Sequence, residues 1–367
     1  MTTTPRARGA RRLTPSALLT AIPGLIGFLP ERSLILLAFG DDPQEVRTTM
    51  RHDLVLDDDG ALVSGMIDLL TQLGDITVRH DARSVVAVIA DDRYPTNSLR
   101  YRRICEIVDA HFEEAGGILA GFVVPRFAAG AQWRTVWNAR RDTPRMNGRR
   151  LTEMFGTPLP GTGVLGDPHS SPTALAAAVK HGRRVLHKRS DIAAGLTPLD
   201  HCVGAHRDDV DTAGLDEATV LRTIVDHVVG GRTDDDLDCA TVTAMGAGLT
   251  DLNVRDAALV LAVTDFRHEA EKLWSSLARR LRGAQAASAA TMLGHLYYVA
   301  GEGAYAGVAL DHALDAEPTW NFAILLDTAL RNGLPPQTLS GTIPACYEVA
   351  EQLGVHLPPP STAQRAC

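Results

Sequence analysis

The chain is poor in aromatic residues, poor in lysine and free of paired cysteines. Aromatics make up 5% of the 367 residues, so the core is expected to consist of Ala, Val and Leu. Only three of the 36 basic residues are Lys. The five cysteines are scattered and form no C-x-x-C pair, which argues against a disulfide framework or a paired-ligand zinc site and fits a reducing cytoplasm. They are Cys105, Cys202, Cys239, Cys346 and Cys367.

Recognised catalytic motifs are also missing. There is no Walker loop, no G-x-S-x-G and no H-E-x-x-H. Gly161, Gly163 and Gly166 spell G-x-G-x-x-G, but no strand precedes them and no helix follows, so dinucleotide binding is excluded. In the densest group of metal-ligand residue types, no two histidines have the i, i+4 spacing of a His-x-x-x-His site. It consists of His181, His187, His201, Cys202 and His206. The sequence therefore favours a non-enzymatic protein and predicts neither a cofactor nor a metal.

The apolar run at residues 14–39 does not have the pattern of a signal peptide or a membrane span. Pro23 and Gly24 interrupt it, and a span over 18–39 would place Glu31 and Arg32 near the bilayer centre, at a cost of several kcal/mol. We therefore expect no membrane association and a cytoplasmic protein. Thr14 and Pro15 predict a helix start, and Pro23 with Gly24 predict its end.

Residues 13–200 are predicted to form an α/β domain. Apolar runs predict strands buried on both faces, and amphipathic segments between them predict helices. Two less apolar segments predict outer strands, the first of them antiparallel. The fold class is a mixed, largely parallel sheet covered by helices. The buried strands are 34–39, 85–90 and 118–124, the helices 61–73 and 98–115, and the outer strands 46–56 and 132–138.

Residues 215–355 are predicted to be entirely helical, with helices at 216–229, 254–263 and 266–281. Small and aromatic residues at 287–320 resemble one tetratricopeptide (TPR) unit, a hairpin of two closely packed helices. One such unit needs neighbours to bury its faces, so the pattern fits either plain helix packing or a peptide-binding groove. The ends, 1–12 and 357–367, are expected to be disordered.

Polar residues near strand ends form a candidate ligand cleft, because ligands bind beyond the carboxyl ends of parallel strands. Turn and capping roles are the alternative. The candidates are Arg51, Asp53, Asp91, Asp92 and Arg134.

Residues 126–189 carry a net charge of +9 in a chain of −8. A candidate anion patch lies within this block, and pairing with acidic segments of the same chain is the alternative. Nucleic acid binding is disfavoured, because no nucleic-acid motif accompanies the charge. The patch comprises Arg140, Arg141, Arg145, Arg149 and Arg150.

The segment LLTAIPGLIGFLPERSLILLAF, followed by Arg51-x-Asp53-Leu54, resembles the opening of the DUF4192 family, a bacterial, mainly actinobacterial group of unknown function. The Trp133 segment, residues 170–192 and the hairpin follow in the same order. The resemblance implies an α/β layout and a cytoplasmic location, and it brings no catalytic residues.

Two functions remain open from the sequence. The first is a non-enzymatic interaction or regulatory protein that contacts a protein partner through its helical C-terminal region. The second is an α/β protein that binds a small ligand, nucleotide or phosphate, either as a binding protein or as an enzyme.

Overall fold

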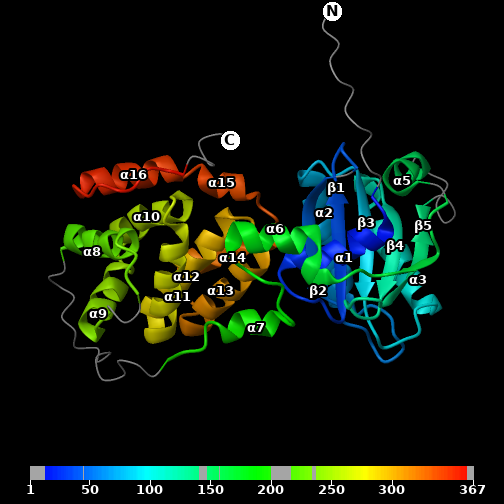
Figure 1. The fold of residues 1–367 in the computed structure, drawn as a ribbon, viewed down its shortest axis with the longest axis horizontal. Helices are drawn as coiled ribbons and strands as arrows, with labels where there is room; N and C mark the ends of the chain where they lie inside the picture. Colours follow the sequence, from blue (N-terminus) through cyan, green and yellow to red (C-terminus); the bar gives the residue numbers. More distant parts are fainter. Residues whose placement is uncertain are drawn as a thin grey trace, which may run out of the picture. The chain divides into compact units, whose positions relative to one another are not determined.

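A computed structural model describes residues 13–43, 45–139, 147–156, 158–199, 216–233 and 237–361, with only the backbone given for 147 and 148. The chain divides into two compact units, Met1–Arg189 and Ser190–Cys367 (Figure 1). The arm predicted at 1–12 and the tail beyond residue 361 lie outside the described residues.

The first unit is built on a six-stranded sheet in the order β2-β1-β3-β4-β5-β6. The sheet is mixed, as predicted, and β2 is an antiparallel edge strand. The prediction of a largely parallel sheet is wrong, since β3 and β4 are the only parallel pair among the described strands. The strands are β1 (Ser33–Phe39), β2 (Val46–Asp53), β3 (Ser84–Ala90), β4 (Ile118–Val124), β5 (Gln132–Asn138) and β6 (Thr162–Val164).

The burial of the strands explains why the sequence did not predict their relative directions correctly. Every residue of β1, β3 and β4 is buried, as their continuous apolar runs predict. Such a run reports cover on both faces and carries no information on direction. The connection from β1 to β3 includes β2 and returns the chain antiparallel to β1.

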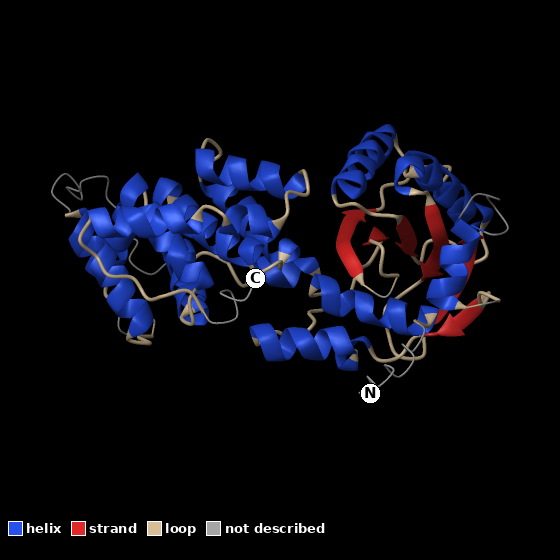
Figure 2. Ribbon diagram, turned by 90° about the horizontal axis from the view of Figure 1, so that it is seen from above, coloured by secondary structure: helices blue, strands red, loops and turns tan. Residues whose placement is uncertain are grey.

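Helices cover both faces of the sheet (Figure 2). Side chains of α2 (Ser64–Arg79) and α3 (Leu99–His111) pack with one set of strand residues in a single apolar cluster. On the other face, Phe122 of β4 meets the ring of Phe155 from α5 (Asn147–Phe155). The Trp133 indole donates to Ser16 Oγ of α1 (Pro15–Ile26) at 3.0 Å.

Helix α1 begins where the sequence predicts but ends later. Thr14 Oγ1 accepts from Ala17 N at 3.1 Å, and Pro15 occupies the first turn. The predicted break at Pro23 is wrong. Pro23 lies inside the helix, and Gly27, with φ of 87°, ends it. Pro23 is itself buried within this helix.

Helix α2 likewise runs past Gly74, so the predicted helix end there is wrong. The helix predicted at 98–115 is α3, which ends at His111; Ser98 caps its start, and a short 3-10 turn, η1 (Glu113–Ala115), leads to Gly116 with φ of 88°. After β6, η2 (Pro168–Ser170), α6 (Pro172–His181) and α7 (Arg189–Ala194) follow. The chain between α6 and α7 forms one isolated bridge, Phe28 to Leu186.

The second unit is helical, as predicted. The hairpin consists of α12 and α13, and Gly294 lets them approach, because a Cβ there would lie 2.9 Å from Leu310. The elements are α8 (Glu217–Val229), α9 (Cys239–Gly248), α10 (Leu252–Ala258), η4 (Leu259–Val263), α11 (Arg267–Arg280), α12 (Gly283–Val299), α13 (Gly303–Ala316), α14 (Asn321–Arg331), α15 (Pro336–Ser340) and α16 (Ile343–Gln352).

Candidate functional site

Polar residues gather where β2, β3 and β4 end and β1 begins. Asp53 lies opposite Ser33, Ser33 lies opposite Ala90, and Ala90 pairs with Val124. Asp91 and Asp92 therefore leave the sheet at the same edge that carries Asp53. The register of the strands alone therefore accounts for the position of these three carboxylates at one edge of the sheet.

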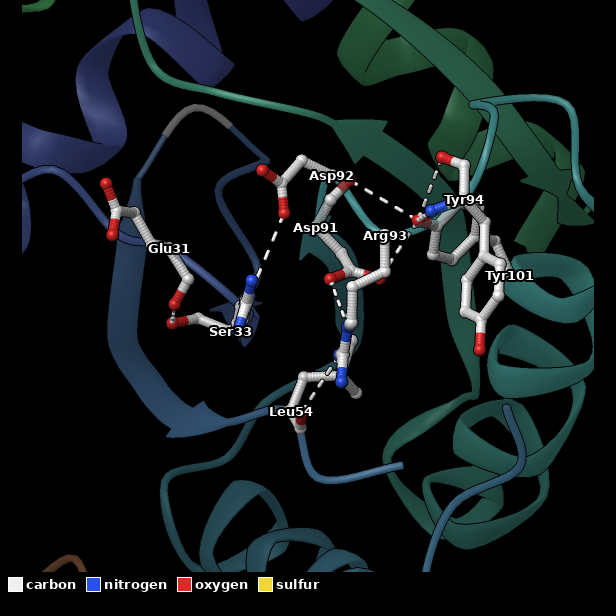
Figure 3. Close-up of polar contacts among 9 residues, drawn as sticks. Glu31, Ser33, Leu54, Asp91, Asp92, Arg93, Tyr94 and Tyr101 are labelled. Atoms are coloured by element: carbon white, nitrogen blue, oxygen red, sulfur yellow. Dashed lines mark hydrogen bonds and ion pairs between the residues drawn. The ribbon is translucent and has the colours of Figure 1, made fainter. Parts of the chain in front are cut away.

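Asp91 is the most enclosed of these groups. Its side chain is 0% exposed and accepts from Arg93 Nε at 2.7 Å (Figure 3). Arg93 Nη2 also donates to the Leu54 carbonyl at 3.0 Å. A buried carboxylate is tolerated when it is paired and hydrogen-bonded, and both conditions hold here. Arg93 thus joins the end of β3 to the chain that follows β2.

Tyr101 of α3 completes the enclosure of Asp91. Its hydroxyl donates to Asp91 Oδ2 at 2.9 Å and accepts from Tyr94 N at 3.2 Å. Burial, reinforced by the hydrogen bond and charge of Asp91, raises the pKa of Tyr101 above its ordinary value. Tyr101 is therefore held as a neutral donor. This arrangement fixes the loop after β3 and leaves both Asp91 oxygens engaged.

A second polar group surrounds Arg51 of β2. Its Nη2 lies 2.6 Å from Asp53 Oδ1, and its Nε donates to Ser33 Oγ at 2.9 Å. The guanidinium lies 5.5 Å from the centre of the Phe28 ring. Burial lowers the pKa of Arg51, Asp53 partly offsets that effect, and the charge of Arg189 lowers it further. Arg51 is already satisfied by groups of its own unit.

The two groups lie toward opposite faces of the sheet. Tyr101 and Leu54, which surround Asp91, belong to the cluster under α2 and α3. Arg51 pairs in register with Ile35, and neither residue belongs to that cluster. Asp92 instead meets Arg32 at 3.8 Å on the surface. The candidate residues thus share an edge without all contacting one another.

Arg134 is the most distant candidate. It lies on β5, opposite Val123 of β4. Four strand spacings separate β5 from β2, about 19 Å at roughly 4.8 Å per spacing. Its Nε is buried and makes no hydrogen bond within the described part of the chain. The structure therefore does not bring Arg134 next to Arg51 and Asp53.

The candidate anion patch is only partly described. Arg140, Arg141 and Arg145 lie outside the described residues. Arg149 Nε lies 2.9 Å from Glu153 on the same helix, and Arg150 donates to the Gly40 carbonyl. Neither contact is a pairing with a separate acidic segment, so the choice between an anion patch and internal pairing stays a prediction.

Several residues at this edge of the sheet were not predicted as site residues from the sequence. Arg93, Tyr101 and Ser33 supply the bonds that fix Asp91 and Arg51, yet none belongs to a motif. The sequence signal was weak: Arg93 and Tyr94 directly follow the paired acids. Leu186 adds a further contact by exchanging backbone hydrogen bonds of 2.9 Å with Gly27 and Leu29.

Cysteine chemistry differs from expectation at one position. The thiols of Cys105 and Cys346 are buried and form no disulfide, whereas Cys239 is disulfide-bonded. Burial raises the pKa of the Cys346 thiol to about 11. The expectation of a reduced chain therefore fails at Cys239, because scattered sequence positions do not report distances in space.

In the part of the chain that the structure describes, no three His, Cys, Asp or Glu side chains come close enough to hold a metal ion. His187 lies edge-on to His169, with ring centres 6.1 Å apart. His201, Cys202 and His206 lie outside the described residues. No described helix has the length and apolar character needed to cross a bilayer.

Comparison with known proteins gives one match. No curated protein and no solved structure matches the chain. The profile described as "Domain of unknown function (DUF4192)" matches residues 15–337, which include the whole described sheet and the helices through α14. The chain therefore belongs to the DUF4192 family.

Proposed function

We propose that the protein is non-enzymatic and binds a protein partner through its helical second unit. The observation that carries this proposal is the outer face of α14. Leu325 is 66% exposed and Ile324 40%, while Ala323 and Leu326 of the same helix are buried. A helix that displays large apolar side chains beside its own buried stripe is typical of an interaction surface.

The charge around α14 indicates the chemistry of the partner. The second unit contains 24 Asp or Glu and 11 Lys or Arg, a formal charge of −13. Asp327 lies on α14 itself, and Asp311 and the exposed Asp315 lie on α13. Arg331 compensates part of this charge by contacting both Asp311 and Asp327. A basic amphipathic segment complements an apolar face with an acidic rim.

The α12–α13 hairpin gives the face a firm support. Helix α14 packs against both hairpin helices. Our interpretation of the hairpin as TPR-like belongs to this proposal, since stacks of such helical repeats present extended surfaces that bind partners. Its support is the close approach at Gly294, where Leu310 fills the space beside the glycine.

The test is cross-linking of the full chain in extract of its source cells, read by mass spectrometry. We expect a partner whose cross-links map to α13 and α14. Leu325→Asp should abolish its recovery, whereas Leu175→Asp, a comparably exposed leucine of the first unit, should not. A partner recovered equally with both variants, or none dependent on residues 254–335, would reject the proposal.

The alternative function, binding of a phosphate-bearing small ligand at the sheet edge, has less support. Arg51, Arg93 and Arg32 each already contact a carboxylate, so an anion would have to displace an internal partner. A thermal shift with nucleotides or phosphorylated metabolites that disappears in Arg51→Met would favour this alternative.

A cytoplasmic location is also part of the proposal. The thiols of Cys105 and Cys346, which form no disulfide, support a cytoplasmic location, whereas the disulfide of Cys239 argues for an oxidising environment. Titration of the thiols in protein taken directly from cells distinguishes the reducing from the oxidising location. Five reactive thiols after denaturation would support the cytoplasm, and three would oppose it.

A further inference from the structure

Helix α6 displays a second apolar face, in the first unit. Val179 is 89% exposed and Leu175 55%, and only Ala174 of the helix is fully buried. Leu175 and Val179 are four residues apart, so they lie on one side of the helix. They form the α6 face together with Lys180, which follows Val179 directly.

The α6 face is held firmly. Ser171 caps the helix by accepting from Ala174 N at 3.2 Å. Thr173 Oγ1 donates to the Ala21 carbonyl of α1 at 2.6 Å. Gly24 of α1 lies against the Ala174 backbone so closely that a Cβ there would be 2.3 Å from Ala174 N. One side of α6 is thus fixed on α1 while the other presents its apolar side chains.

The segment that contains α6 and the chain directly after it is basic. Residues 168–190 contain five Lys or Arg and no Asp or Glu. Lys180 and Arg184 are exposed. The first unit as a whole has 25 Lys or Arg against 20 Asp or Glu, a charge of +5. The bridge from Leu186 to Phe28 keeps this basic stretch on the body of the unit.

We infer that the α6 face binds an acidic amphipathic segment of another protein. Apolar residues of that segment pack on Leu175 and Val179, and its carboxylates meet Lys180 and Arg184. Such packing uses the i, i+4 anchors with which amphipathic helices recognise one another. The surface is independent of the α14 face and takes a partner of the opposite charge.

Two other classes of partner fit less well. Single-stranded nucleic acids are bound by aromatic stacking along a basic groove, and residues 168–190 contain no Phe, Tyr or Trp. Helices that lie on membranes present a broad apolar face, commonly with Trp or Phe. Helix α6 has ten residues and offers two large exposed apolar side chains. An acidic protein segment requires neither feature.

The experiment titrates the full-length protein into a labelled synthetic peptide of about 15 residues, roughly three to four helical turns, with Leu on one helical face and Glu on the other. We expect saturable binding that weakens as NaCl rises from about 50 to about 500 mM. The charge-reversed Leu/Lys peptide, an oligothymidylate and phosphatidylglycerol vesicles should bind far more weakly at this face.

Substitutions in α6 and in the second unit test whether the peptide binds at the α6 face. Leu175→Ser with Val179→Ser, and separately Lys180→Glu with Arg184→Glu, should each weaken the peptide by about tenfold or more. Leu325→Ser, a similarly exposed leucine in the second unit, should leave the affinity unchanged. Because all these side chains are exposed, the thermal midpoints of the variants should match the parent, which verifies folding.

Three outcomes would overturn the inference. The first is no peptide binding by a protein of normal thermal midpoint. The second is binding that both α6 double variants leave intact. The third is binding of the oligonucleotide or the vesicles that both double variants abolish while the peptide stays unbound, which would assign the face to that class instead.

Discussion

Gly74 of α2 lies against the carbonyl of His111 at the end of α3, so close that a Cβ at position 74 would stand 2.5 Å from that oxygen. The glycine therefore permits helix packing, and α2 continues through it to Arg79.

Gly74→Ala should destabilise the protein although alanine is the better helix former. The two helices must separate to admit the methyl group, at a cost of about 2 kcal/mol. Gly65 provides a matched control in the same helix, because a Cβ there meets nothing within 4 Å. Gly65→Ala should be neutral or stabilise by up to about 1 kcal/mol. Urea unfolding of both variants measures the difference, and equal effects would show that α2 and α3 do not constrain each other here.

The same glycine shows what the sequence can and cannot predict. Apolar runs predicted β1, β3 and β4 because burial on both faces leaves a compositional trace. Gly74 and Pro23 were interpreted as helix ends because local propensity is all that a sequence displays. The helices nevertheless continue through both residues, and the contact of Gly74 with the His111 carbonyl is set by the tertiary fold, which the local sequence does not display.

The candidate site divides along the same line. Asp91 and Asp53 were predicted at one edge because strand ends can be located from the sequence. The partners of Asp91, Tyr101 and Arg93, were not predicted, since Tyr101 comes from a helix whose facing residues no motif reports. Arg51 and Asp91 lie toward opposite faces of the sheet. Which face a residue takes depends on the register of the neighbouring strands.

Removing the Tyr101 hydroxyl should destabilise the first unit. Tyr101→Phe leaves Asp91 Oδ2 buried without its donor, which costs about 1–3 kcal/mol. Tyr94→Phe is the control, because no hydrogen bond of the Tyr94 hydroxyl is found among the described residues. It should change the unfolding free energy by less than about 0.5 kcal/mol. If both variants unfold alike in urea, Asp91 does not depend on Tyr101.

Acid should destabilise the second unit through His295. This histidine of α12 is buried, its Nδ1 makes no hydrogen bond in the described structure, and burial lowers its pKa to about 4. The unfolded chain takes up the proton near pH 6.5 and the folded chain only near pH 4. Stability is therefore lost as the pH falls through this window, by about 3 kcal/mol in total.

His295→Met should remove that part of the pH dependence. The difference in unfolding free energy between pH 7 and pH 5 should shrink by about 2 kcal/mol relative to the parent. His268→Gln, which alters a half-exposed histidine of α11, should keep the parental difference. A His295→Met protein with the full parental pH dependence would mean that His295 is not held neutral.

Gly24→Ala should loosen α6 from α1. The new methyl group would lie 2.3 Å from the Ala174 backbone nitrogen, and a backbone atom cannot turn aside as a side chain can. We expect a loss of about 2 kcal/mol in unfolding free energy and faster amide exchange across residues 172–181. Gly161→Ala, where a Cβ meets nothing within 4 Å, controls for the change of residue type.

Because the α6 face depends on the contact between α6 and α1, Gly24→Ala should also weaken binding of the Leu/Glu peptide. Unchanged exchange in α6 would show that Thr173 alone, through its bond to Ala21, is enough to hold the helix in place.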